Sequence, residues 1–495
     1  MTDSVLPGGR RANIVFIQSD SQDGRAMGWA GHPAMARATP NLDALAAAGV
    51  AFETACCNNP ICCPSRASMW SGRYTHHCEA WNNYKGLEPE TPTFRTSLDA
   101  AGYRTQTFGK TDYLSGAHTI RARVTAWLRS ACIPRPAYRM NPPLILERDE
   151  PRVHEMDWDD ADRSAAWLAD AAGEPDRPFF LYLGIRAPHP GFTSSRMYLD
   201  RIDAAGVTIP PADRQDHPCM AHQRVCKNWP HGFAEEMVRK VRHIYFAMIA
   251  EVDAMVGRVL AAIDELGLAG STYVIFTSDH GELAMEHRQE GKMNLYEPAV
   301  RVPLIVRGPG VPAGRRVAAA VSLVDIYPTL MDLAGLAGPA GLDGESLLPA
   351  LTGREGPRRD WVLSEYHDTT LSTGCFMLRR GDWKYLAYVG CEPQLFHLAD
   401  DPHEIVNLAA DRPGVVAGMD ARLREIVDYE AVDAKVKAYD RASFRQWRTE
   451  QKSAGTYEQT MARIYSGWDR FAEGDLQPWT DRDEAQVRRW LDAGA

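Results

Sequence analysis

The sequence lacks the features of a membrane protein or a nucleic-acid-binding protein. No apolar run is long enough to span a bilayer, and the polar N-terminus contains no apolar stretch of signal-peptide length. Acidic residues outnumber basic ones by 65 to 55, which gives a formal net charge of −10 and leaves no basic footprint for nucleic acid. We therefore expect no membrane or nucleic-acid partner and a cytoplasmic location.

The ten cysteines lack the spacing of a disulfide framework, and no CxxC pattern indicates a zinc site. We expect them to be reduced thiols. Internal repeats and low-complexity tracts are also missing. The composition, with 45% hydrophobic and 9% aromatic residues in a chain of 495, is that of a globular protein with a sizeable core.

Short apolar runs that favour buried strands alternate with segments of helical periodicity. The strands are expected over 13–19, 103–108, 178–184, 272–278 and 302–306. The helices are expected over 39–49, 162–172, 233–266 and 321–334. This alternation predicts an α/β fold in which a large, mainly parallel sheet is covered by helices on both faces.

The composition changes after residue 352, where four short apolar runs suggest a small antiparallel sheet that packs with a helix near 414–428. From residue 429 the chain is charged but retains four tryptophans, which is too aromatic for a disordered tail. We predict a large α/β domain over 1–352, a small C-terminal antiparallel α+β subdomain over 353–428 and a helical extension over 429–495. The extension would pack on the body or on a second copy of the chain, so a homo-oligomer is one expected arrangement.

The run Cys62-Cys63-Pro64-Ser65-Arg66 has the character of a helix start. Pro64 fits the first turn of a helix, which places Cys62 just ahead of the N-terminus, where free N–H groups and the helix dipole favour an anion. A thiol at this position is activated because the dipole lowers its pKa. Arg66 lies one turn further on and can reach back to the same place. The alternative is a helix cap that contains a buried, unreactive cysteine.

Polar side chains follow three of the expected strands. Asp20 follows the first strand, Asp279 and His280 follow the strand 272–278, and Lys110 follows the strand 103–108. The carboxyl ends of strands in such a sheet are where ligands bind. Carboxylates with a nitrogen or oxygen donor suit a hard divalent cation, so these residues are candidate metal ligands, although capping roles for the aspartates and a solvated lysine are the alternatives.

A group-transfer centre at the same edge would need cations and a proton donor. Lys110, Lys292 and Arg66 could stabilise the charge of a dianionic group. His189 or His217 could serve as a general acid, because imidazole titrates near neutrality.

The motifs, taken in chain order, resemble the landmarks of the type I sulfatases. They are Thr39-Pro-Asn-Leu, the cysteine motif at 62–66, Phe-Gly-Lys110, Pro-His189-Pro, Ser-Asp279-His-Gly-Glu and Val302-Pro-Leu-Ile-Val-Arg-Gly-Pro-Gly310. The resemblance implies an alkaline-phosphatase-like sandwich fold and the hydrolysis of sulfate monoesters. It also implies that a formylglycine-generating enzyme converts Cys62 to formylglycine, and that one calcium ion per subunit is bound by Asp20, residue 62, Asp279 and His280.

The resemblance further implies roles in the reaction. Calcium and Arg66 hold the formylglycine hydrate, one hydroxyl of which attacks sulfur, while Lys110, Lys292 and a histidine bind the sulfate. Two positions depart from the wider family: Ser21 replaces a second aspartate, and Asp112 stands where many members have a histidine. Both departures leave open whether His189 or His217 protonates the leaving group.

Within the family, the details are most similar to the glucuronate-2-sulfatases of glycosaminoglycan breakdown, notably at 59–66, 81–86 and 282–289. This similarity predicts a sulfated uronic acid as substrate, with Lys85 and His217 as candidate partners of its carboxylate. The alternatives are a phosphonate monoester or phosphodiester hydrolase of the same superfamily, and a non-catalytic protein that binds sulfated sugars.

Overall fold

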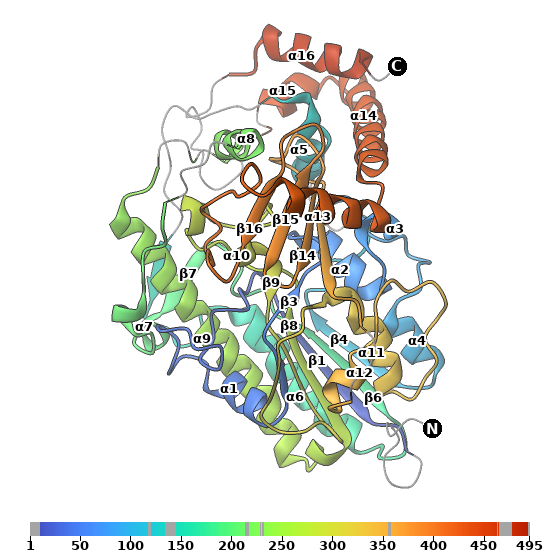
Figure 1. Ribbon diagram of the computed structural model, residues 1–495. Coiled ribbons are helices and arrows are strands. Elements are labelled where there is room, and N and C mark those ends of the chain that lie inside the picture. Colours follow the sequence, from blue (N-terminus) through green and yellow to red (C-terminus); the bar gives the residue numbers. More distant parts are fainter. Residues whose placement is uncertain are drawn as a thin grey trace.

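A twisted seven-stranded sheet runs through the centre of the computed structural model, which describes residues 10–116, 120–133, 145–212, 217–227, 229, 232–354, 358–462, 464 and 478–493 (Figure 1). Its strands, in spatial order, are β11 (Arg315–Val317), β2 (Val50–Phe52), β10 (Leu304–Arg307), β8 (Thr272–Ser278), β1 (Asn13–Ser19), β6 (Phe179–Gly184) and β4 (Arg104–Gly109). Only β10 runs antiparallel to its neighbours. The predicted mainly parallel sheet is therefore confirmed.

Helices cover both faces of this sheet, because alternate residues of each central strand point to opposite sides. Ile14 and Phe16 of β1 belong to one buried cluster, and Val15 and Ile17 to another. The helices that contribute to the first cluster include α2 (Cys62–Ser71), α4 (Phe94–Ala100), α11 (Ile326–Leu333) and α12 (Leu348–Leu351). Those that contribute to the second are α1 (Pro40–Ala47), α6 (Glu155–Ala172) and α9 (Glu235–Glu265). The result is the predicted three-layer arrangement.

One predicted helix begins later than the sequence suggested. The segment 321–334 starts with strand β12 (Val321–Ser322), which pairs with β3 (Ala55–Cys56), and passes through a short 3₁₀ turn before α11 begins. The backbone N–H of Ser322 donates to Asp325 Oδ2 at 3.0 Å, part of a capping box that fixes this start.

Short elements complete the large domain. They are β9 (Arg301–Val302), which also pairs with β3, the parallel pair β5 (Ile145–Arg148) and β7 (Phe192–Ser195), and the helices α3 (Thr75–Cys78), α5 (Ile120–Trp127), α7 (Arg196–Leu199), α8 (Pro218–Cys226) and α10 (Glu297–Val300).

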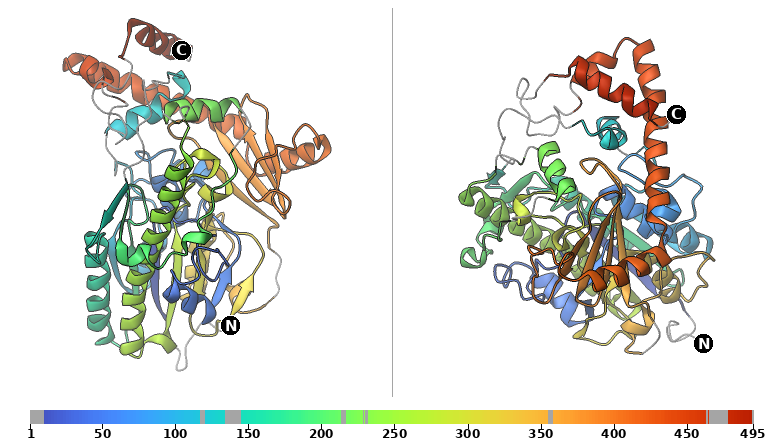
Figure 2. Two further views of the ribbon diagram at one scale, coloured as in Figure 1. Left: turned by 90° about the vertical axis from the view of Figure 1, so that its left-hand side faces the viewer. Right: turned by 45° about the horizontal axis from the view of Figure 1, so that its top comes forward.

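A four-stranded antiparallel sheet follows the large domain, as the four short apolar runs predict. Its strands are β13 (Trp361–Tyr366), β14 (Cys375–Arg380), β15 (Trp383–Tyr388) and β16 (Gln394–His397). Helix α13 (Pro413–Ile426) packs against one face of it through Met419 and Leu423. Figure 2 shows this sheet beside the upper end of the central one.

The C-terminal extension contains α14 (Tyr429–Ser453), α15 (Tyr457–Ala462) and α16 (Asp481–Asp492), at the top of Figure 1. Phe444, Trp447 and Trp490 share a buried cluster with Trp127 of α5. The extension therefore packs on the body of the same chain. Trp468, another tryptophan of this segment, lies outside the described residues. Across the described parts of the chain, no helix has both the length and the apolar character required to cross a bilayer.

Candidate active site

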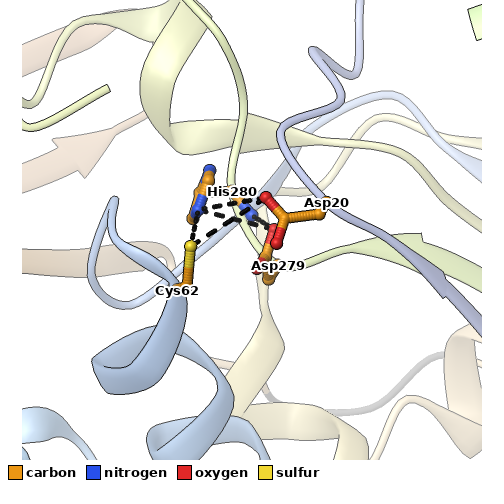
Figure 3. Close-up of side chains that lie close together, drawn as sticks. All are labelled: Asp20, Cys62, Asp279 and His280. Carbon is orange, nitrogen blue, oxygen red and sulfur yellow. Dashed lines mark hydrogen bonds and ion pairs between the residues drawn. The ribbon is translucent and has the colours of Figure 1, made fainter. Parts of the chain in front are cut away.

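Four side chains that are far apart in sequence converge at the carboxyl edge of the central sheet (Figure 3). Asp20 follows β1, Asp279 and His280 follow β8, and Cys62 begins α2. One ligating atom from each lies within 4.8 Å of the other three, and all four residues are buried. β1 and β8 are adjacent parallel strands whose carboxyl ends coincide, which brings the two aspartates together.

Cys62 is the first residue of α2 rather than the residue ahead of it. Pro64 lies in the first turn as predicted, and Gly72 ends the helix in a left-handed conformation with φ 66°. Cys62 Sγ lies 3.3 Å from His280 Nε2 and 3.9 Å from Asp20 Oδ1. The helix N-terminus therefore points the thiol into the cluster.

Arg66, one turn further along α2, is completely buried behind the cluster. Its Nε donates to Asp279 Oδ2 at 2.8 Å, and its Nη2 lies 3.4 Å from Asp20 Oδ2. Its Nη1 donates to Gln18 Oε1, to the Tyr182 hydroxyl oxygen and to the Lys110 carbonyl oxygen at 3.0–3.1 Å. A buried guanidinium with this many acceptors fixes both carboxylates in orientation.

In each aspartate, one carboxylate oxygen binds these cations and the other faces the centre of the cluster. The Oδ2 atoms are held by Arg66 and, for Asp20, by Lys110 Nζ at 2.5 Å. The Oδ1 atoms instead lie 3.8 Å and 3.6 Å from His280 Nε2. Two carboxylate oxygens, one imidazole nitrogen and the residue-62 side chain thus surround one point, and this donor set suits a hard divalent cation.

Ser21 links the cluster to a second lysine. It adopts a left-handed conformation with φ 63°, and its Oγ donates to Asp20 Oδ1 at 3.0 Å and accepts from Lys292 Nζ at 3.2 Å. Ser21 therefore holds Lys292 beside the cluster without adding a negative charge.

The cations around the cluster favour the ionised forms of the Cys62 thiol and the Asp20 carboxyl. Burial and Asp20 oppose ionisation of the Cys62 thiol, but Lys110, Lys292 and His280 outweigh them and hold its pKa well below the ordinary value. Burial likewise opposes the charge of Asp20, yet Lys110, followed by His189, lowers the pKa of that carboxyl well below its usual range.

A cavity of about 480 Å³ adjoins the cluster on the Lys110 side. It is lined by residues that follow β4 and β6, among them Lys110 and His189, together with His154. His189 is exposed, and its Nδ1 lies 2.6 Å from the Pro190 carbonyl oxygen. Among the described residues no hydrogen bond engages His189 Nε2, so this ring nitrogen can exchange a proton with a ligand in the cavity.

The structure does not bring His217 or Lys85 to this place. His217 caps α8 by accepting from the backbone N–H of Cys219, and its Nε2 lies 2.8 Å from the Glu392 carbonyl oxygen. Lys85 Nζ donates to Glu88 Oε1 at the surface. Neither side chain lines the cavity. Of the two predicted proton donors, only His189 lies beside the cluster.

Sequence reasoning missed several residues that the tertiary structure places at the site. Gln18 and Tyr182 hold Arg66, and Arg186 and His154 line the cavity. Arg186 follows β6, so the strand-end rule that selected Lys110 could have found it. No local signal marks His154, because its partner Glu251 lies on α9, almost one hundred residues away.

Two family models match the chain. The model described as "Sulfatase" matches residues 12–336, and the model described as "N-sulphoglucosamine sulphohydrolase, C-terminal" matches residues 285–428. Among curated proteins, arylsulfatase K of Bos taurus is 40% identical over 478 residues, covering 91% of this chain and 88% of the bovine protein. Arylsulfatase K of Homo sapiens is 38% identical over 505 residues, covering 97% of this chain and 92% of the human protein.

Solved structures share the alkaline-phosphatase-like fold. The phosphonate monoester hydrolase of Agrobacterium radiobacter superposes with a TM-score of 0.70 at 26% identity, covering 86% of this chain and 96% of that one. A 2-O GAG sulfatase superposes with a TM-score of 0.66 at 23% identity, with the same coverage, and this likeness concerns the fold alone.

Proposed function

The chain belongs to the sulfatase family and is a sulfuric ester hydrolase, and from that premise we propose that it removes the 2-O-sulfate of sulfated uronic acids. The reaction would use a formylglycine made from Cys62 and one bound calcium ion. The observation that carries the proposal is the buried convergence of Asp20, Cys62, Asp279 and His280 at the N-terminus of α2.

With Cys62 converted to formylglycine, the donor set would consist of oxygens and one imidazole nitrogen, which fits calcium better than a softer metal. Two carboxylate oxygens point inward while Arg66 and Lys110 hold the outer ones, and oxygen ligands are those that calcium prefers. When bound, calcium would polarise a sulfate oxygen, and a formylglycine at position 62 would provide a hydrated aldehyde as the nucleophile. Conversion of Cys62 would require a formylglycine-generating enzyme as a transient partner.

The chain's own residues have separable tasks in this reaction. Lys110 and Lys292 bind the sulfate oxygens and neutralise the charge that develops on them. Arg66 fixes the orientation of both aspartates. His189 Nε2 protonates the departing alcohol from the cavity side.

Three measurements test the proposal. Mass spectrometry of the peptide that contains residue 62 should find the aldehyde in the active protein, and a chelator should abolish turnover that calcium, but not zinc, restores. Methyl glucuronide 2-sulfate should be hydrolysed in preference to 6-sulfated glucosamine and a neutral aryl sulfate. An active preparation with an intact Cys62 thiol, or one that contains zinc, would contradict the proposed chemistry.

A phosphonate monoester hydrolase is the second candidate, favoured by the similarity to the Agrobacterium radiobacter enzyme. Sulfatase and phosphonate hydrolase activities share the same nucleophile in this proposal, so the substrate distinguishes them. Turnover of an aryl phosphonate monoester faster than of the matching aryl sulfate would favour this second function. Tight binding of a sulfated sugar without turnover would indicate the non-catalytic alternative.

A further inference from the structure

We propose that the cavity beside Lys110 is the subsite for the sugar acid of the substrate, and that Arg186 binds its carboxylate. This inference rests on the proposed function, since it assigns a place to the second negative charge of a sulfated uronic acid. The cavity lies at the carboxyl ends of the edge strand β4 and its neighbour β6. Lys110 lines this cavity and also contacts Asp20 of the cluster, so one sugar ring can span the two sites.

Arg186 is anchored along one side only. Its Nη1 donates to Asp157 Oδ1 and to Asp160 Oδ2, both at 2.9 Å, and its backbone N–H donates to Asp157 at 3.0 Å. Both aspartates are buried, whereas 38% of the arginine side chain is exposed. Among the described residues, no hydrogen bond engages Nε or Nη2 of Arg186. An anchored guanidinium with an open edge is the geometry that receives a carboxylate.

His154 is positioned on the same cavity by a buried carboxylate. Its Nδ1 lies 2.8 Å from Glu251 Oε2, while Glu251 Oε1 accepts from the backbone N–H groups of Val153 and His154 and from Trp158 Nε1 at 2.8–3.1 Å. Glu251 is completely buried. With Nδ1 engaged by Glu251, Nε2 is the ring nitrogen that faces a ligand in the cavity. His154 therefore suits a hydrogen bond with a sugar hydroxyl.

The rest of the lining agrees with a polar ring that carries an acid. Asp112, which lies 3.3 Å from Lys110 Nζ, offers carboxylate oxygens to further hydroxyls. The overall charge of −10 repels a doubly anionic ligand, so a fixed local cation is needed. Lys85 and His217, the cations favoured by the sequence, do not line the cavity, and Arg186 takes that role.

The test compares two substrates that differ only at the acid. They are methyl glucuronide 2-sulfate and methyl glucoside 2-sulfate, in which the carboxylate is replaced by a hydroxymethyl group. The measured quantity is the ratio of their kcat/KM values. In Arg186→Gln this ratio should fall at least about tenfold, mainly through a higher KM for the glucuronide. Arg186→Lys keeps a cation for Asp157 and Asp160 but loses the open edge, and it should show the same direction of change.

Arg163→Gln is the matched control. Arg163 Nη1 donates to Asp160 at 3.1 Å, so its removal also takes a cation from that carboxylate, but the side chain is 64% exposed and does not line the cavity. The ratio should stay within about twofold of wild type in this variant. A purely structural role of Arg186 would lower both kcat/KM values together and leave the ratio unchanged.

The outcomes separate the subsite from the proposed function. If wild type prefers the glucuronide and folded Arg186→Gln or Arg186→Lys keeps that preference, the subsite assignment is overturned. If wild type shows no preference for the glucuronide, the uronic acid proposal itself fails. Should Arg186→Gln not fold, the ratio measured for Arg186→Lys decides alone.

Discussion

Replacing Arg66 with methionine is expected to lower the free energy of unfolding by about 3–5 kcal/mol, the cost of breaking a buried ion pair by removing one partner. Asp279 is the carboxylate that mainly loses its cationic partner, because Asp20 retains Lys110. The three neutral acceptors of Nη1, one of them on Gln18, also lose their donor. An unfolding entropy of about 2 cal/mol/K per residue for a chain of 495 residues converts this loss to a decrease in Tm of about 3–5 °C.

The assay is thermal unfolding in a chelating buffer, combined with turnover of an aryl sulfate in calcium. Arg129→Met provides the matched control, because Arg129 is also buried and donates to a buried carboxylate, Asp440, at 3.0 Å, outside the cluster. Both variants should lose stability, but only Arg66→Met should lose turnover. If Arg66→Met unfolds within about 1 °C of wild type, or keeps full turnover, the proposed orientation of the two aspartates by this arginine is refuted.

Three further predictions concern the nucleophile, the proton donor and acid stability. Cys62→Ala should abolish turnover, whereas Cys63→Ala should keep most of it, because the Cys63 thiol points at a backbone carbonyl at 3.9 Å; equal losses in kcat would contradict the assignment of the nucleophile. His189→Gln should slow the hydrolysis of alkyl sulfates at least about tenfold more than that of activated aryl sulfates. His217→Gln should change neither rate and should lower the free energy of unfolding by about 1 kcal/mol through loss of a helix cap. The reverse pattern of rates would exchange the roles of the two histidines. Burial opposes the charge of Glu286, but Arg25 and other cations hold its pKa below the ordinary value of 4.5. The ionised Glu286 therefore stabilises the protein above that pH, and this contribution is lost as the pH falls. Urea unfolding at pH 7 and pH 4 should show a smaller decrease in unfolding free energy for Glu286→Gln than for wild type, and an equal decrease would count against this ion pair.

The local pattern of the sequence was sufficient for the architecture. Strand β1 has the predicted bounds, and β8 does also, because each is a short, doubly buried apolar run that no helical periodicity imitates. The cysteine motif also predicted a helix start from local sequence alone, because Pro64 lacks a backbone N–H and is favoured in the first turn of a helix. Some boundaries were missed: α6 begins at Glu155 rather than near 162, and α11 begins after Val321, which pairs with Ala55 in a short strand.

The sequence alone also identified Asp20, Cys62, Asp279 and His280, since strand ends and a helix N-terminus mark them locally. Sequence reasoning also favoured Lys110, Lys292 and Arg66 as the cations at this edge, and the structure places them there. It favoured Lys85 and His217 as partners of the substrate carboxylate, but Lys85 pairs with Glu88 and His217 caps α8. Arg186 and His154 meet at one cavity only because β4 lies beside β6 and Glu251 reaches across from α9. Charge and periodicity are properties of short segments, whereas the partners of a side chain depend on contacts between segments that are distant in the sequence, and only the packed structure determines these.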